Sequence, residues 1–265
     1  MRLYQAVLMG LLTTGIVISA QDTLVAQEKK AKPEDTESYT PVPVVTAAKE
    51  VSTPPPSDAV VLFDGKDLSQ WVNTNDRTKP ALWTVRDGVF TVDKKAGNIE
   101  TKSSFSNYQL HLEWRIPATI LGKGQVRGNS GLFLASLGKG DLGYELQILD
   151  SYQNETYTNG MVGSIYKQFA PLANPSRKPG EWQSYDVIWT APTFNADNSL
   201  NTPARVTVLL NGVLVQDNTI LKGPTQYVGE ASYRQAHGAS PIKLQSHGDP
   251  SEPISFRNIW IRSLK

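Results

Sequence analysis

The sequence has no cysteine among its 265 residues, which excludes disulfides, thiolate metal sites and a cysteine nucleophile. Oxygen-ligated cations stay open, because Asp, Asn and backbone carbonyls are plentiful. An excess of one charge is also lacking, with 26 Lys and Arg against 25 Asp and Glu, so nothing favours nucleic acid or anionic lipid over a neutral partner. Serine-hydrolase elbows, phosphate-binding glycine loops and His-Glu-x-x-His motifs are absent as well, which sets those enzyme classes aside.

The first 20 residues have the pattern of a secretory signal. Arg2 precedes an apolar run that ends at Ala20, where a peptidase could cut, and cleavage after Ala26 is the alternative. The run is barely long enough to span a bilayer, so a retained anchor is the competing interpretation. We expect export, with no stable membrane insertion once the signal is removed.

Residues 21–57 combine Lys, Glu, Thr and Ala with several prolines and almost no aromatic side chains. Such a segment cannot bury enough apolar surface to order itself. We therefore expect a disordered, Pro-rich linker over 21–57 and one folded domain over 58–265.

Short apolar or alternating runs, separated by Gly, Pro, Asn and Asp, predict about eleven strands in the folded domain. Residues 108–116 alternate strictly, which predicts a strand with one buried face and one wetter face that carries His111 as a surface histidine. Asp87-Gly88 and Asn211-Gly212 are typical of two-residue hairpin turns. With no comparable helical stretch, the fold class is all-β: a jelly-roll or legume-lectin-like β-sandwich of two large antiparallel sheets.

The segment 143–150 carries polar side chains on a candidate active strand. Alternation places Glu145 and Gln147 on one face, while Asp150 joins that face only if a bulge intervenes. Upstream, the glycine-flanked residues Arg127 and Asn129 could donate to sugar hydroxyls or to a carbonyl oxygen. Each segment is equally well explained as ordinary structure, an amphipathic strand and a tight loop.

A third polar segment precedes the C-terminus. Lys243, Gln245 and His247 alternate with apolar residues and share one face, which makes His247 the best placed proton-transfer group of the three histidines. A structural hydrogen bond at the strand end is the competing explanation for His247. His237 could border the site or belong to an ordinary loop, and Tyr166 could stack on a sugar ring or belong to the core.

Several dispersed motifs, taken in order from Ala59 to Leu264, resemble the 3-keto-disaccharide hydrolase family. They are Leu62–Trp71 (LFDGKDLSQW), Trp83–Gly88 (WTVRDG), Gly128–Phe133 (GNSGLF), Tyr144–Asp150 (YELQILD), Gly180–Trp182 (GEW), Leu210–Gly212 (LNG) and Phe256–Ile259 (FRNI). The resemblance implies a concanavalin-like jelly roll, export to the bacterial periplasm or cell surface, and an oxidised glycoside as the carbohydrate substrate.

In such a substrate a C3 ketone acidifies the C2 proton, so a base can remove it and expel the C1 substituent, and water can then add back. The resemblance gives the acid or base roles to Glu145, Asp150 and His247. Recognition of hydroxyls or of the enolate falls to the remaining polar candidates, which are Arg127, Asn129, Gln147, Tyr166, Lys243 and Gln245. A divalent ion near Glu145 and Asp150 could stabilise the enolate instead, although no spacing demands one.

Two other functions use the same fold. The first is a non-catalytic module that only binds carbohydrate. The second is a laminarinase-like endo-glycanase, because Glu145, Gln147 and Asp150 resemble a distorted copy of the motif Glu-x-Asp-x-(x)-Glu. The central amide counts against this second function, since double displacement needs two carboxyl groups about 5–5.5 Å apart.

Overall fold

Strands provide nearly all the regular structure of residues 30–265, which are the residues that the computed structural model describes. Helical structure in this range is limited to three short 3₁₀ turns at Pro33–Thr36, Gly124–Val126 and Thr158–Gly160. The all-β prediction is confirmed. No helix within residues 30–265 has the length and apolar character needed to cross a bilayer. The predicted signal sequence, with either cleavage site, lies outside the described residues.

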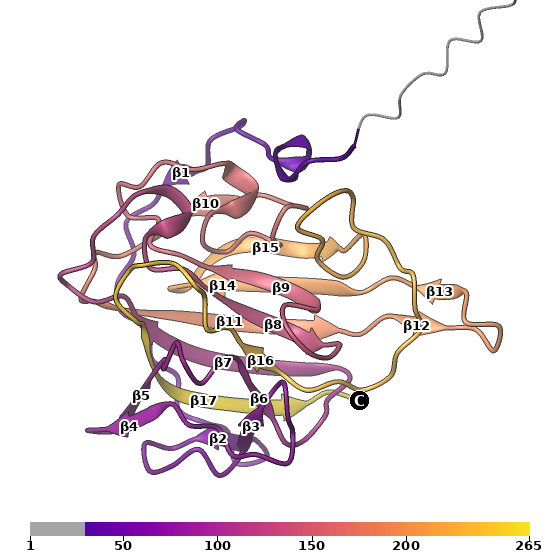
Figure 1. The fold of residues 1–265 in the computed structure, drawn as a ribbon, viewed down its shortest axis with the longest axis horizontal. Helices are drawn as coiled ribbons and strands as arrows, with labels where there is room; N and C mark the ends of the chain where they lie inside the picture. Colours follow the sequence, from indigo (N-terminus) through magenta and orange to yellow (C-terminus); the bar gives the residue numbers. More distant parts are fainter. Residues whose placement is uncertain (1–29) are drawn as a thin grey trace, which may run out of the picture. The chain divides into compact units, whose positions relative to one another are not determined.

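The larger of two main sheets has eight antiparallel strands (Figure 1). In spatial order they are β15 (Val213–Ile220), β14 (Arg205–Leu210), β11 (Trp182–Thr190), β7 (Tyr108–Arg115), β17 (Ser255–Ser263), β5 (Val89–Thr91) and β4 (Thr84–Arg86), with β2 (Val60–Phe63) also paired to β17. We refer to it as the large sheet.

The small sheet has five antiparallel strands and packs face to face on the large sheet. Its order is β3 (Trp71–Asn73), β6 (Ile99–Thr101), β16 (Lys243–Leu244), β8 (Ser130–Ser136) and β9 (Gly143–Ile148). Two further strand pairs lie outside the sheets: β1 (Val44–Val45) with β10 (Ala173–Asn174), and β12 (Thr193–Phe194) with β13 (Leu200–Thr202).

The core fills the space between the two sheets with alternate residues of their strands. Leu112 of β7, Leu132 of β8 and Leu146 of β9 belong to one continuous buried cluster. Two buried tyrosines of the large sheet reach across it: Tyr108 donates to the Leu134 carbonyl at 2.6 Å, and Tyr185 donates to the Gln147 carbonyl at 2.5 Å. A buried hydroxyl needs such a partner, and here each partner is backbone of the small sheet.

Both predicted hairpin turns are confirmed by their backbone angles. Asp87 and Gly88 join β4 to β5 with φ of 52° and 77°, and Asn211 and Gly212 join β14 to β15 with φ of 51° and 79°. Positive φ at both central residues is the type I′ requirement that Asp-Gly and Asn-Gly meet at low cost.

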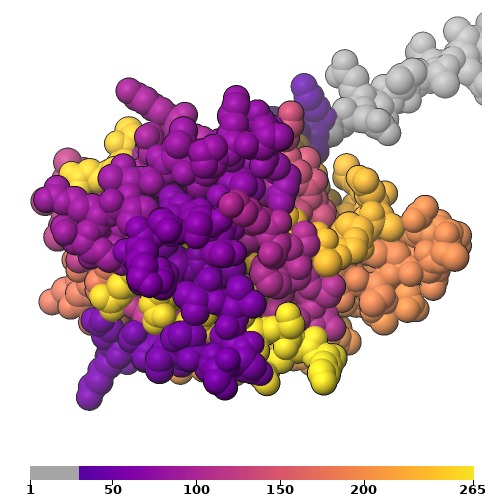
Figure 2. All heavy atoms as spheres, turned by 90° about the horizontal axis from the view of Figure 1, so that it is seen from below, coloured from indigo at the N-terminus to yellow at the C-terminus, as the bar shows by residue number. Residues whose placement is uncertain are grey.

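Residues 31–57 differ from the expected disordered linker, because the structure places them along the sandwich. β1 pairs with β10, the Ser38 amide donates to Asn159 Oδ1 at 3.0 Å, and Trp260 Nε1 donates to the Thr53 carbonyl at 2.9 Å. Figure 2 shows the early residues in indigo and the C-terminal ones in yellow on one face. Few apolar side chains are buried here, and the order comes from polar contacts with distant residues that composition cannot reveal.

The outward face of β7 is also different from its prediction, since His111 and Glu113 are fully buried there. His111 Nδ1 lies 2.8 Å from Asp186 Oδ1, and its Nε2 lies 3.2 Å from Glu113 Oε1. Ser52 donates to Glu113 at 2.5 Å from the N-terminal segment, so the strand is covered on both sides. Burial alone raises the pKa of Glu113, but hydrogen bonds from His111, Ser52 and other donors lower it to about 2.

Candidate functional site

A row of paired residues crosses the outer face of the small sheet. Glu100 of β6 pairs with Lys243 of β16, Lys243 pairs with Phe133 of β8, and Phe133 pairs with Glu145 of β9. Residues paired directly across antiparallel strands point to the same face, so these four side chains share it while their strand neighbours enter the core. The alternation of polar and apolar residues in the sequence therefore predicts which of these side chains point away from the core.

The next position along the strands places two amides on the same face. Gly131 pairs with Gln147, and the backbone N–H of Gln245 donates to the Gly131 carbonyl at 2.9 Å. A Cβ on Gly131 would lie only 2.5 Å from Glu145 Oε1, so the glycine is what leaves room for the carboxyl group of Glu145.

A pocket of about 150 Å³ lies above Glu145 and these amides. We call it the Glu145 pocket. It is lined by Asn129, Asp141, Glu145, Gln147, Tyr166, Thr225, Tyr227, Gln245 and His247. Six of these are residues proposed from the sequence, and they come from four separate stretches of the chain.

Asp150 and Arg127 lie outside this pocket and bind each other. Arg127 Nε is 2.7 Å from Asp150 Oδ2, and the Tyr152 amide donates to Asp150 Oδ1 at 3.0 Å. Asp150 lies beyond the end of β9 and at an odd separation from Glu145 along the chain, so its side chain does not share the face of Glu145. The structure therefore does not bring Asp150 and Arg127, predicted as a catalytic group and a substrate ligand, together with the residues of this pocket: they form an ion pair in which Asp150 is buried and Arg127 is partly exposed.

Lys243 is on the expected face but does not reach the pocket. Its Nζ donates to the carbonyls of Gly138, Gly140 and Leu142 at 2.8 to 2.9 Å, and the side chain is fully buried. Three acceptors use all three ammonium protons. Burial lowers its pKa to about 8. Lys243 therefore anchors the loop after β8, and the structure does not bring this predicted substrate ligand into the pocket.

Glu145 is 5% exposed, and that burial dominates its electrostatics. Burial, together with the nearby charge of Asp141, raises its pKa to about 8, although Lys243 acts in the opposite direction. A carboxyl group with such a pKa is mostly protonated at neutral pH, which makes Glu145 able to donate a proton.

His247 borders the pocket from the segment after β16, with its side chain one-third exposed. Its Nδ1 lies 2.9 Å from Asp249 Oδ2. Burial raises the pKa of Asp249, but hydrogen bonds from His247 and Ser251 outweigh this and hold it below its usual value. The Asp249 backbone amide also approaches Nδ1, at 3.2 Å, so two groups of Asp249 orient the ring. In the tautomer that carries its proton on Nδ1, the carboxylate accepts this proton and Nε2 is the proton acceptor.

Tyr166 and Gln245 complete the wall with two different kinds of polar group. The Tyr166 hydroxyl lies 2.6 Å from the Tyr157 hydroxyl, and burial raises its pKa to about 12. Gln245 is 5% exposed, and its Oε1 has no hydrogen-bond partner among residues 30–265. A buried amide oxygen without a partner is costly unless a ligand supplies a donor, so Gln245 Oε1 is suited to accept a hydrogen bond from a hydroxyl group.

The sequence predictions missed four residues at or beside this pocket. Asp249 follows His247 at a spacing of two residues, and this His-x-Asp pattern could have been found. Asp141, Thr225 and Tyr227 come from loops without any periodic signal, and only the tertiary structure brings them here.

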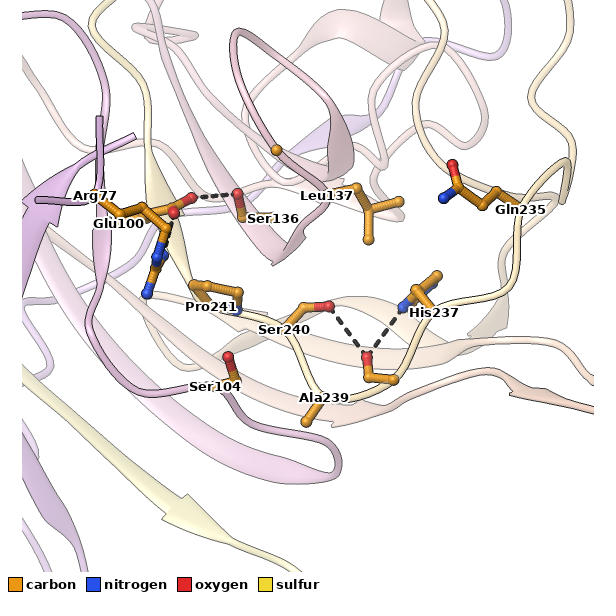
Figure 3. A pocket seen from close by; sticks show the side chains of 12 residues that line it. Arg77, Glu100, Ser104, Ser136, Leu137, Gln235, His237, Ala239, Ser240 and Pro241 are labelled. Carbon is orange, nitrogen blue, oxygen red and sulfur yellow. Dashed lines mark hydrogen bonds and ion pairs between the residues drawn. The ribbon is translucent and has the colours of Figure 1, made fainter. Parts of the chain in front are cut away.

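A second pocket, of about 430 Å³, lies at the other end of the same row (Figure 3). Its charged groups are already paired: Glu100 accepts from Arg77 and, at 2.5 Å, from Ser136. His237 lines it with Nε2 at 2.8 Å from the Tyr144 hydroxyl, so His237 belongs to this pocket and not to the Glu145 pocket. The reactive combination of groups lies in the Glu145 pocket.

The two carboxyl groups considered for a divalent ion, Glu145 and Asp150, are not brought together. Within residues 30–265 no cluster of three or more His, Cys, Asp or Glu side chains has the arrangement of a metal site. Asp150 is committed to Arg127, so this pair does not fit an ion.

Jelly-roll sandwiches are the fold of many lectin domains, among other proteins. The sequence profile of the 3-keto-alpha-glucoside-1,2-lyase-like domain matches residues 58–262. The chain belongs to this family, and the resemblance drawn from its motifs is confirmed. It is a carbohydrate-active enzyme by that membership.

Solved structures agree with this assignment. A candidate glycosyl hydrolase from Parabacteroides distasonis is 54% identical, with a TM-score of 0.75 over 87% of this chain and 96% of its own. Two more from the same organism are 20% and 23% identical, with TM-scores of 0.56 and 0.55; each covers 78% of this chain, and 94% and 99% of its own length. The last two show likeness of fold alone. A search of curated proteins gave no match.

Proposed function

We propose that this protein cleaves glycosides whose sugar is oxidised at C3, by elimination across C1 and C2 followed by addition of water. The observation that carries this proposal is the pairing, in one pocket, of a carboxyl group with a pKa of about 8 and a histidine oriented by Asp249. Family membership and the similarity to a candidate glycosyl hydrolase support the same class of chemistry.

His247 is the base in this mechanism. Its Nε2 takes the C2 proton of the substrate, and Asp249 stabilises the imidazolium that forms. The electrons of the C2–H bond form the enolate of the C3 ketone. Gln245 Oε1, which has no protein partner, can accept a hydrogen bond from a substrate hydroxyl, and the NH₂ group of the same amide can donate to the ketone oxygen; Asn129 lines the same pocket.

Glu145 is the acid. As the enolate collapses to a C1–C2 double bond, the C1–O bond breaks and the departing oxygen takes the proton of Glu145. Adding water across the double bond returns the protons and completes a net hydrolysis. A single carboxyl group is enough for this route, whereas the laminarinase-like alternative also needs Asp150, which lies outside the pocket.

The same proposal places the enzyme outside the cytoplasm, in the bacterial periplasm or at the cell surface. The support is the Arg2 and apolar pattern of residues 1–20.

The test is a product assay on the purified protein with a 3-keto glucoside and with its unoxidised parent. Consumption of the keto substrate alone is the expected result, with Glu145→Gln and His247→Ala each lowering kcat by about 10²–10⁴-fold. Consumption of the parent would point to an ordinary glycosidase, and binding without turnover to a carbohydrate-binding module. Full activity in both variants would refute the assigned roles.

A further inference from the structure

Three side-chain amides form a hydrogen-bonded chain that leads to Glu145. They belong to Gln125, Asn129 and Gln147. Gln147 Nε2 donates to Gln125 Oε1 and to Asn129 Oδ1, each at 3.2 Å. We call this group the amide chain.

The far end of the amide chain has a fixed orientation. Gln125 Nε2 donates to Thr156 Oγ1 at 3.0 Å and to the Gly160 carbonyl at 2.9 Å, so its oxygen must face Gln147. Asn129 Nδ2 donates to the Gln125 carbonyl at 2.8 Å, so its oxygen faces Gln147 as well. A carbonyl oxygen can only accept a hydrogen bond, so the contacts with the Gly160 and Gln125 carbonyls determine which way the two amides point.

That orientation determines the last amide. Facing two oxygens, Gln147 must present its NH₂ group to them and its own carbonyl oxygen to the other side. There Oε1 lies 3.2 Å from Glu145 Oε1 and 3.3 Å from the Ser130 carbonyl. Turning the amide over would give donors to Glu145 and to the Ser130 carbonyl, but it would set the Gln147 oxygen against two amide oxygens at 3.2 Å that cannot carry a proton. The first orientation leaves one such contact, the one with the Ser130 carbonyl.

Two oxygens 3.2 Å apart attract each other only if a proton lies between them, and Gln147 Oε1 cannot carry it. We propose that the amide chain holds Glu145 in its protonated form, so that Gln125, Asn129 and Gln147 are positioning residues that make Glu145 a proton donor. The role of that proton in glycoside cleavage rests on the proposed function, whereas the protonated state does not.

The charged and titratable groups around Glu145 come from several elements. Lys243 of β16, Asp141 in the loop after β8, Tyr166 after β9 and His247 after β16 are the neighbours from these elements. Asp141 and burial favour the protonated form and Lys243 opposes it, in agreement with a pKa of about 8.

The sign of one pKa change tests the proposal. In Gln147→Met the acceptor for the Glu145 proton is lost, so the pKa of Glu145 is expected to fall by about one unit, a tenfold weaker hold on the proton. If Gln147 instead donated to an ionised Glu145, the same substitution would raise that pKa. The measurement is an infrared titration of the protonated carboxyl band, assigned by its loss in Glu145→Gln.

Gln245→Met is the matched control, because this amide lines the same pocket and makes no hydrogen bond to the amide chain within the described residues. It is expected to leave the titration of Glu145 within a few tenths of a unit. An equal fall in both variants would overturn the proposal, since the effect would then follow from loss of any pocket amide.

Gln125→Met provides a second route if Gln147→Met does not fold. Gln125 is only half-buried, and its loss frees Gln147 to turn its NH₂ group toward Glu145, so a fall in the pKa of Glu145 is again expected. A rise or no change would overturn the proposal. The titration needs no substrate, so a protein that fails to cleave 3-keto glucosides but shows these changes refutes only the proposed function.

Discussion

Replacing Glu145 by glutamine should change how the stability of the protein depends on pH. The variant keeps a donor for the Gln147 oxygen but cannot ionise. In the wild type the pKa of Glu145 is raised from 4.5 to about 8, so the folded state holds a proton that the unfolded state releases. Stability from this group is complete below pH 4.5 and is lost as pH rises toward about 8.

The size of the effect follows from the same shift. Each pKa unit corresponds to about 1.4 kcal/mol, so the difference between 4.5 and about 8 amounts to about 5 kcal/mol when Glu145 is fully ionised. About 4 kcal/mol of this should be lost by pH 8. Relative to Glu145→Gln, the free energy of unfolding of the wild type should therefore fall steadily between pH 5 and pH 8.

Urea denaturation of both proteins at unit pH intervals measures this difference, and titrations common to both cancel. Glu155→Gln is the control, because Glu155 is exposed, and its difference from the wild type should stay within about 0.5 kcal/mol. A difference for Glu145→Gln that stays constant from pH 5 to pH 8 would show that Glu145 ionises normally, and the reasoning about its burial would be refuted.

Three other outcomes follow from the structure. Asp249→Asn should leave the fold intact but lower kcat on a 3-keto glucoside by 10²-fold or more, because His247 loses the group that orients its ring; an unchanged kcat would argue against a His-Asp pair. Glu113→Gln should cost about 3 kcal/mol at pH 7, since its pKa of about 2 adds stability above pH 4.5 that is lost toward pH 2; urea titrations that show the same deficit at pH 2.5 would contradict this. Removing residues 31–57 should destabilise the domain by about 3 kcal/mol, from lost hydrogen bonds to Glu113, Arg257 and Trp260; an unchanged Tm would count against it.

Local signals allowed the fold to be predicted. Alternation identifies strands because the side-chain period of a strand is two residues, and Asp87-Gly88 and Asn211-Gly212 encode their turns directly. The same local rule put Glu145 and Gln147 on one face of their strand and Gln245 on the polar face of another, and the three residues line one pocket. These properties depend on a few neighbouring residues only.

What the sequence could not reveal depends on contacts between distant segments. Lys243 was assigned to the correct face, but its ammonium group meets three carbonyls of a loop about a hundred positions earlier. His111 alternates as a surface residue would, yet it is buried because Ser52, Asp186 and Trp260 surround the cluster that it forms with Glu113. The composition of residues 31–57 likewise does not indicate the distant residues, such as Asn159 and Trp260, that bind this segment.

The tyrosines that cross the core have a consequence for how the sandwich can move. Apolar packing between the two sheets is non-directional, whereas the hydroxyls of Tyr108 and Tyr185 bind particular backbone atoms of the opposite sheet. Tyr185 binds the carbonyl of Gln147, the residue whose side chain contacts Glu145. These hydrogen bonds hold the small sheet, whose outer face forms the floor of the Glu145 pocket, in a fixed position against the large sheet. The large sheet contributes no residue to that pocket.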